Sequence, residues 1–145
     1  MAVKSKRLKR RVTGLGGVFL RARRPKLLAR WYRDHLGLDV AGQVAVFRWC
    51  SPRGRGHIGH TVWALLGPRD YDFGSKHARA MVNYRVRDLD WVLKMLRRER
   101  VAVEDRIEES KYGRFGWVTD PEGNRIELWE PPARYVTAEH HIPME

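Results

Sequence analysis

The sequence lacks the features that define several protein classes. Its 145 residues include one cysteine, which excludes a disulfide framework and a cysteine-based metal cluster. The longest stretch without Lys, Arg, Asp or Glu is 13 residues, from Gly56 to Pro68. A membrane-spanning helix needs ~18. No apolar run follows the basic N-terminus at signal-peptide distance, so nothing indicates export. We therefore expect one cytoplasmic domain with no membrane partner.

Familiar catalytic and nucleotide-binding motifs are also missing. The serines stand in no recognisable nucleophile motif, and the glycines at 14, 16 and 17 do not complete a dinucleotide-binding fingerprint. Arg53 to Gly56 is not followed by the Lys-Ser/Thr ending of a phosphate-binding P-loop. The sequence thus contains no common catalytic motif that we recognise.

Acidic residues are absent from the first eleven positions, which hold six of the 29 basic residues. Without this segment the chain has 23 basic and 17 acidic residues, so the net charge falls from +12 to +6. We interpret residues 1–11 as a flexible basic arm. Such an arm can bind nucleic acid through its charge, or merely keep a chain soluble. Nucleic-acid association is therefore our third hypothesis, and we do not expect it to be the main function.

The apolar pattern predicts an order of strands and helices that occurs twice, about 65 residues apart. One helix begins near Pro25 and ends at Gly37, and Asp88 caps the other. We assign Trp31 and Trp91, which lie at helical spacing, to the core. A tight turn is expected at 120–124. The predicted strands cover 15–22, 44–49, 58–66, 80–86, 101–107, 114–119 and 125–130.

Three segments carry a resemblance to a known family. The sequence from Tyr112 to Pro131, YGRFGWVTDPEGNRIELWEP, looks like the C-terminal signature of the vicinal-oxygen-chelate superfamily. That superfamily includes glyoxalase I, extradiol dioxygenases, and fosfomycin- and bleomycin-resistance proteins. GLGGVFLR from Gly14 with WYRDHLGL from Trp31 resembles its opening strand and helix, and VNYRVRDLD from Val82 resembles the start of its second module. The match covers residues 12–132 and indicates a divergent member.

The resemblance implies an α+β fold in which two βαβββ modules, about 12–74 and 75–132, form an open cupped mixed sheet around one cleft. Residues 133–145 would form a C-terminal tail. Enzymes of the family hold a divalent metal in the cleft through His, Gln or Glu side chains on the first and last strands of each module. These positions fall on Gly17, Met81 and Glu127, and the fourth lies near Trp63 or Ala64.

Only Glu127 among these positions can bind a hard divalent metal, because glycine has no side chain and a thioether is too soft. A catalytic metal site usually needs about three protein ligands. We therefore expect no metal and no other cofactor. A metal held through an unpredicted ligand such as His60 stays the alternative.

Strand alternation extends the cleft from these positions to their neighbours two residues away. The intervening residues are almost all apolar, as expected for a helix-covered face. We also expect a loop over 108–113 to cover the cleft mouth. The predicted cleft residues are Phe19, Arg21, Met81, Asn83, Arg85, Arg125 and Trp129, with Tyr112 and Arg114 at the rim.

Such a cleft suits a small molecule with an apolar body and a polar or anionic group. In the alternative interpretation Arg85 or Arg125 pairs with Glu127, and no charged ligand is needed. Our first hypothesis is a metal-independent small-molecule binding protein. Drug-sequestering members of this fold bind ligands in clefts of a homodimer, so the resemblance also implies a homodimer. The second hypothesis is a lyase, isomerase or dioxygenase-like enzyme with a non-standard site around Glu127, which could act as a general base.

Overall fold

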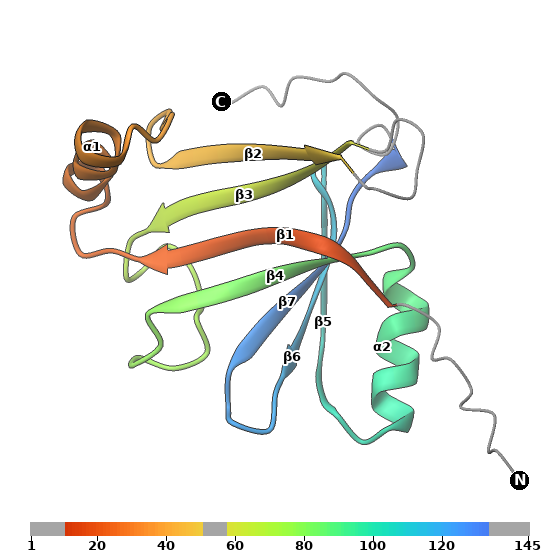
Figure 1. The fold of residues 1–145 in the computed structure, drawn as a ribbon. Coiled ribbons are helices and arrows are strands. Elements are labelled where there is room, and N and C mark those ends of the chain that lie inside the picture. The colour runs from red at the N-terminus through yellow and green to blue at the C-terminus, as the bar shows by residue number, and fades with distance from the viewer. Residues whose placement is uncertain (1–10, 51–57, 134–145) are drawn as a thin grey trace, which may run out of the picture.

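The computed structural model describes residues 11–50 and 58–133, which form one seven-stranded sheet with two helices (Figure 1). The sheet order is β2-β3-β1-β4-β7-β6-β5. The strands are β1 (Val12–Arg21), β2 (Val44–Cys50), β3 (Ile58–Leu66), β4 (Ala80–Val86), β5 (Ala102–Ser110), β6 (Gly113–Thr119) and β7 (Arg125–Glu130), and the helices are α1 (Pro25–Leu36) and α2 (Leu89–Arg98).

The sheet consists of two related modules joined by the antiparallel pair β1–β4. In each module the first strand pairs in parallel with the last, β1 with β3 and β4 with β7. The remaining strand pairs are antiparallel, so the sheet is mixed and open, as predicted. Within the described ranges the first module has two strands after its helix, whereas the second has three.

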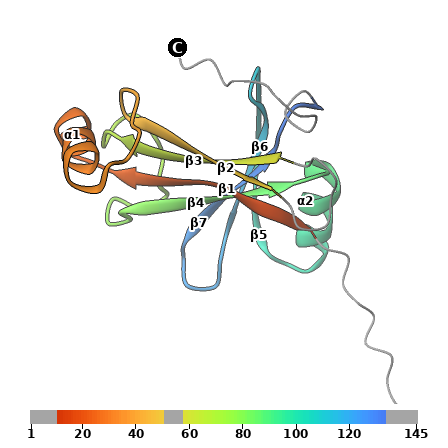
Figure 2. The ribbon, with the colours of Figure 1, turned by 45° about the horizontal axis from the view of Figure 1, so that its top comes forward.

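The two helices pack against the same face of the sheet. Figure 2 shows them at opposite ends of it. The α2 helix begins at Asp88, whose Oδ1 accepts a 2.9 Å hydrogen bond from the Trp91 backbone N–H, as the sequence predicts. Its apolar side packs against β4, β6 and β7, with Leu89 and Leu93 almost fully buried. The predicted helix cap and core side of this element are confirmed.

One core assignment in α1 is wrong. Leu28, Ala29 and Tyr32 pack against β3, but Trp31 is 49% exposed. Residues 27 and 31 lie about 100° around the helix from residues 28 and 32, since a helix turns once in ~3.6 residues. Only the second of these two apolar stripes faces the sheet. Trp31 therefore lies on the surface.

The opposite face of the sheet, here called the helix-free face, is covered by the connection between β3 and β4, residues 67–79. Phe73 from this loop is buried against Met81 and Trp117 of the sheet. The expected loop over 108–113 is wrong, because β5 continues to Ser110 and only residues 111–112 turn. The helix-free face is thus covered by a different segment from the one predicted.

Candidate functional site

Strand pairing brings most of the predicted cleft residues onto the helix-free face. Across β1–β4 Phe19 lies opposite Met81, and across β4–β7 Asn83 lies opposite Glu127. Met81, Asn83 and Glu127 are at most 2% exposed, because the 67–79 loop packs over them. The predicted register is therefore correct. These residues form a closed polar centre rather than the floor of an open cleft.

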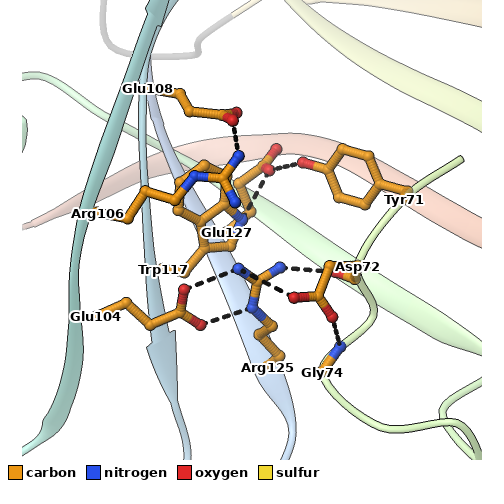
Figure 3. Close-up of polar contacts among 9 residues, drawn as sticks. All are labelled: Tyr71, Asp72, Gly74, Glu104, Arg106, Glu108, Trp117, Arg125 and Glu127. Carbon is orange, nitrogen blue, oxygen red and sulfur yellow. Dashed lines mark hydrogen bonds and ion pairs between the residues drawn. The ribbon is translucent and has the colours of Figure 1, made fainter.

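Glu127 is the centre of this cluster and accepts hydrogen bonds from three side chains, of which Figure 3 shows Tyr71 and Trp117. The Asn83 amide donates to Oε1 at 2.6 Å, and the Trp117 indole donates to Oε2 at 3.0 Å. The Tyr71 hydroxyl, from the covering loop, donates to the same Oε2. Both carboxylate oxygens thus have internal donors, and no arginine pairs with Glu127 among the described residues.

Burial raises the pKa of Glu127, although the three donors oppose this shift by stabilising the carboxylate. Burial and the neighbouring Glu127 charge also raise the pKa of Tyr71, so its hydroxyl stays a donor at neutral pH. The cluster can therefore hold either a carboxylate with three donors or a protonated acid. Groups with such shifts are candidates for proton transfer.

Two of the predicted cleft arginines hold the covering loop in place. Arg125 donates to both oxygens of Glu104, at 2.6 and 2.8 Å, and to the Asp72 carbonyl at 2.6 Å (Figure 3). Arg21 donates to the carbonyls of Ser75 and Lys76 and stacks on Phe73, 4.8 Å from the ring centre. These contacts fix the loop to the sheet at two points, Asp72 and residues 75–76.

Arg85 differs from these two arginines because its side chain has no hydrogen-bonded partner among the described residues. It is 7% exposed, and its guanidinium carbon lies 5.6 Å from the ring of Trp49 and 5.3 Å from the ring of Trp129. Its Nη1 is buried without a hydrogen-bond partner in the part of the chain that the structure describes. Burial lowers the pKa of Arg85.

The two predicted rim residues lie apart from the Glu127 cluster. Tyr112 is 37% exposed in the β5–β6 turn, and its carbonyl accepts a hydrogen bond from the Trp129 indole at 2.8 Å. Arg114 pairs across the sheet with Glu130, one position away from Trp129 and so on the helix-covered face. It forms two 2.9 Å hydrogen bonds with Asp90 of α2.

The approximate two-fold symmetry of the sheet identifies the fourth family position. Because the resemblance matches Gly17 of β1 to Met81 of β4, Phe19 corresponds to Asn83, two residues further along each strand. Because Phe19 pairs with Ala64 and Asn83 pairs with Glu127, Ala64 is the counterpart of Glu127. The four positions are therefore Gly17, Ala64, Met81 and Glu127. They supply one carboxylate, already engaged by three donors, and this set does not fit a hard divalent cation.

His60 lies on β3, four residues before Ala64 and so ~13 Å along the strand. It is 8% exposed and pairs across the sheet with Arg48. Burial lowers its pKa, and the charges of Arg48 and Arg85 add to this effect. Among the described residues no group of three or more His, Cys, Asp or Glu side chains could hold a metal ion.

A separate hollow of about 490 Å³ lies between the start of α1 and the beginning of the 67–79 loop. None of the predicted cleft residues lines it. Its lining includes the cationic residues Arg24, Lys26 and Arg69 together with Asp70. In the described ranges, no helix is long and apolar enough to span a membrane.

Two partners of Glu127 are not among the predicted site residues. Trp117 pairs directly with Glu127 across β6–β7, a position that follows from the hairpin around the 120–124 turn. Tyr71 lies in a loop without periodicity, so no local pattern indicates that it reaches the sheet. The first could have been predicted from strand register, and the second required the tertiary structure.

Comparison with solved structures gives the same fold. The methylmalonyl-CoA epimerase from Mycobacterium tuberculosis is 21% identical, with a TM-score of 0.59 over 92% of this chain and 95% of that one. A methylmalonyl-CoA epimerase in complex with methylmalonyl-CoA and NH4+ is 17% identical, with a TM-score of 0.65 over 88% and 99%. A Streptomyces coelicolor methylmalonyl-CoA epimerase variant in complex with 2-nitronate-propionyl-CoA is 18% identical, with the same TM-score and coverage.

No curated protein matches the sequence. The profile of the Glyoxalase/Bleomycin resistance protein/Dioxygenase superfamily matches residues 14–128, which run from Gly14 of β1 to Leu128 of β7 and include both helices. The mixed seven-stranded sheet of the described residues agrees with that match. The chain therefore belongs to the Glyoxalase/Bleomycin resistance protein/Dioxygenase superfamily.

Proposed function

We propose that this protein binds a small polar or anionic organic molecule on the helix-free face without a metal ion. The observation that carries this proposal is the chemistry of the four family positions. Gly17, Ala64 and Met81 supply no ligand for a hard cation, and Glu127 is enclosed by three hydrogen-bond donors. A metal would have to displace these donors and find its remaining ligands elsewhere.

Aromatic side chains of the kind that bind organic molecules lie on this face and against Arg85. Trp129 stacks on Phe115 with the ring planes 5° apart, and Trp129 and Trp49 both lie against the buried cation Arg85. Aromatic side chains with a few placed polar groups are the usual lining of a small-molecule site. This composition supports a ligand that has an unsaturated or apolar body and a polar or negatively charged group.

Two measurements on the full chain test this function. Elemental analysis of protein purified without chelator should find no stoichiometric Zn, Ni, Fe or Mn. A thermal-shift screen of organic acids, amides and amines in the presence of EDTA should find compounds that raise Tm, because a ligand that binds only the folded state stabilises it. A stoichiometric metal, or a screen with no stabilising compound, contradicts the proposal.

The second candidate function is proton transfer by Glu127, as in an isomerase or lyase. Its raised pKa and its contact with Tyr71 favour this role, because a general acid or base works best when its pKa lies near the working pH. Tyr71 belongs to the 67–79 loop, so a substrate would reach Glu127 only after that loop moves.

Deuterium incorporation separates the two candidates. Methylmalonyl-CoA, which is bound in one of the similar structures, is a suitable probe because its acidic carbon exchanges hydrogen when a base acts on it. Our first proposal predicts no enzyme-dependent incorporation from heavy water, measured by mass spectrometry. Incorporation that disappears in Glu127→Gln would instead establish the second candidate.

We also propose that the protein is a homodimer, as expected from the drug-sequestering members of this fold. Leu27 and Trp31 lie one helical turn apart on α1 and are exposed, as are Leu36 at the end of that helix and Phe47 on β2. Exposed apolar surface of this kind supports association. Light scattering coupled to size-exclusion chromatography should give twice the 17.0 kDa chain mass, whereas a monomer would contradict the proposal.

A further inference from the structure

We propose that Arg85, which contacts the rings of Trp49 and Trp129, binds the anionic group of the ligand, a carboxylate or a phosphate. This inference rests on the proposed function and adds the residue that recognises the ligand and the charge of the group recognised. It is independent of the Glu127 cluster, whose hydrogen bonds do not involve Arg85.

The first observation is the missing partner of Arg85. Burying a guanidinium costs several kcal/mol unless an anion or hydrogen-bond acceptors compensate. Arg85 is 7% exposed, yet in residues 11–50 and 58–133 its side chain forms no hydrogen bond or ion pair, and Nη1 is buried. The other arginines predicted for this site each have hydrogen-bonded partners: Arg21 has carbonyls, Arg114 has Asp90, and Arg125 has Glu104.

The second observation is that glycines bring the two tryptophan rings against the sheet. A Cβ atom added at Gly14 or Gly59 would overlap the Trp49 ring, and one added at Gly16 would lie 3.0 Å from the Trp129 ring. The rings therefore occupy the space that a side chain at these glycine positions would fill. Cation–π contact with both rings holds the guanidinium in position but gives its N–H groups no acceptor.

The third observation is the sign of the surrounding charge. The charges that act on nearby His60 are those of Arg48 and Arg85, and both are positive. The pKa of Arg85 is lowered by burial, with no carboxylate acting on it. A buried cation with unpaired N–H groups and no carboxylate acting on it favours an anion, and a planar guanidinium can bind two oxygens of a carboxylate or phosphate together.

The test compares probes that share one phenyl group and differ in charge. Benzoate, phenyl phosphate and neutral benzamide are titrated into the full chain, and binding is followed by calorimetry. We expect the wild-type protein to bind at least one of the two anions about tenfold more tightly than benzamide. The anion that binds more tightly distinguishes carboxylate from phosphate recognition.

In Arg85→Met the affinity for the anion should fall by about tenfold to a hundredfold, as expected for a lost hydrogen bond to a charged group. The affinity for benzamide should not change. Arg106→Met is the matched control, because Arg106 also stacks on a tryptophan of this sheet, 5.2 Å from the ring of Trp117, but pairs with Glu108. That variant should bind the anion like wild type.

Arg85→Met removes a buried side chain, so a change in its folding would also change its affinity. Binding is therefore also followed by NMR on the wild-type protein. The side-chain Nε–H resonance of Arg85 should shift when benzoate is added and stay unchanged with benzamide. An unchanged resonance, or equal anion affinity in folded Arg85→Met, overturns this inference. If the broader screen finds ligands but neither anion binds, the inference fails while the proposed function stands, whereas a screen without ligands overturns both.

Discussion

At the scale of single residues, two carboxylates of the sheet differ in the sign of their pKa shifts because their environments differ. Glu127 is almost fully buried, and burial raises its pKa despite three donors. Glu104 lies at the edge of the sheet, where two hydrogen bonds from Arg125 lower its pKa. The two groups should therefore make opposite contributions to the pH dependence of folding.

We predict that Glu127→Gln changes the pH dependence of stability in a defined direction. A raised folded-state pKa means that the folded protein holds this proton more tightly than the unfolded chain. The stability contributed by Glu127 is thus present below pH ~4 and is lost as pH rises through the folded-state pKa. The difference in unfolding free energy, wild type minus variant, should fall with rising pH, by at most ~1.4 kcal/mol per pH unit. Urea denaturation at several pH values measures it.

The companion variant Glu104→Gln should show the opposite slope. Its lowered folded-state pKa gives stability that is present above the ordinary glutamate pKa and is lost as pH falls through the folded-state value. The difference in unfolding free energy, wild type minus Glu104→Gln, should therefore grow as pH rises from acidic values. If both variants gave slopes of the same sign, the assignment of Glu127 as a buried acid would be wrong.

At the scale of elements, the 67–79 loop decides whether the helix-free face is closed. Its Phe73 is 2% exposed between Met81 and Trp117. We predict that Phe73→Ala lowers the unfolding free energy by about 3–5 kcal/mol, as for other buried phenylalanines. The control Ile107→Ala, at a side chain 37% exposed on β5, should lower it far less. Equal losses in urea denaturation would mean that the loop does not pack on the sheet.

The start of each helix gives a second prediction at this scale. Asp88 accepts a capping hydrogen bond at the start of α2, whereas Arg24 before α1 makes no side-chain cap. Asp88→Ala should therefore cost about 1 kcal/mol of stability. Arg24→Ala should stay within about 0.5 kcal/mol of wild type in thermal unfolding. A larger loss in Arg24→Ala would show that the start of α1 is stabilised by a contact other than a cap.

At the scale of the whole molecule, the sheet and the face that carries the site follow from local sequence patterns. Strand alternation is a local property, so the sequence alone places Met81, Asn83 and Glu127 on one face. The same alternation, applied to the β6–β7 hairpin, places Arg114 opposite Glu130 and away from the site, which contradicts its prediction as a rim residue. The resemblance was needed to identify the metal positions, because spacing alone does not show which strand positions are equivalent.

Features that depend on tertiary contacts could not be predicted from the sequence. Tyr71 reaches Glu127 from a loop without periodicity, and Trp49 contacts Arg85 across several strands. The basic arm is outside the described residues except for Arg11, which forms an ion pair with Glu99. The C-terminal tail is likewise outside them beyond Ala133. The expected role of these two segments stays a prediction.

The central claim is that the helix-free face binds its ligand without a metal. The most direct measurement is the dissociation constant of the tightest compound from the screen, determined by calorimetry with and without EDTA. We predict the same dissociation constant in both conditions and no change when Zn²⁺, Ni²⁺ or Mn²⁺ is added. Binding that is lost in EDTA and restored by one of these cations would contradict it.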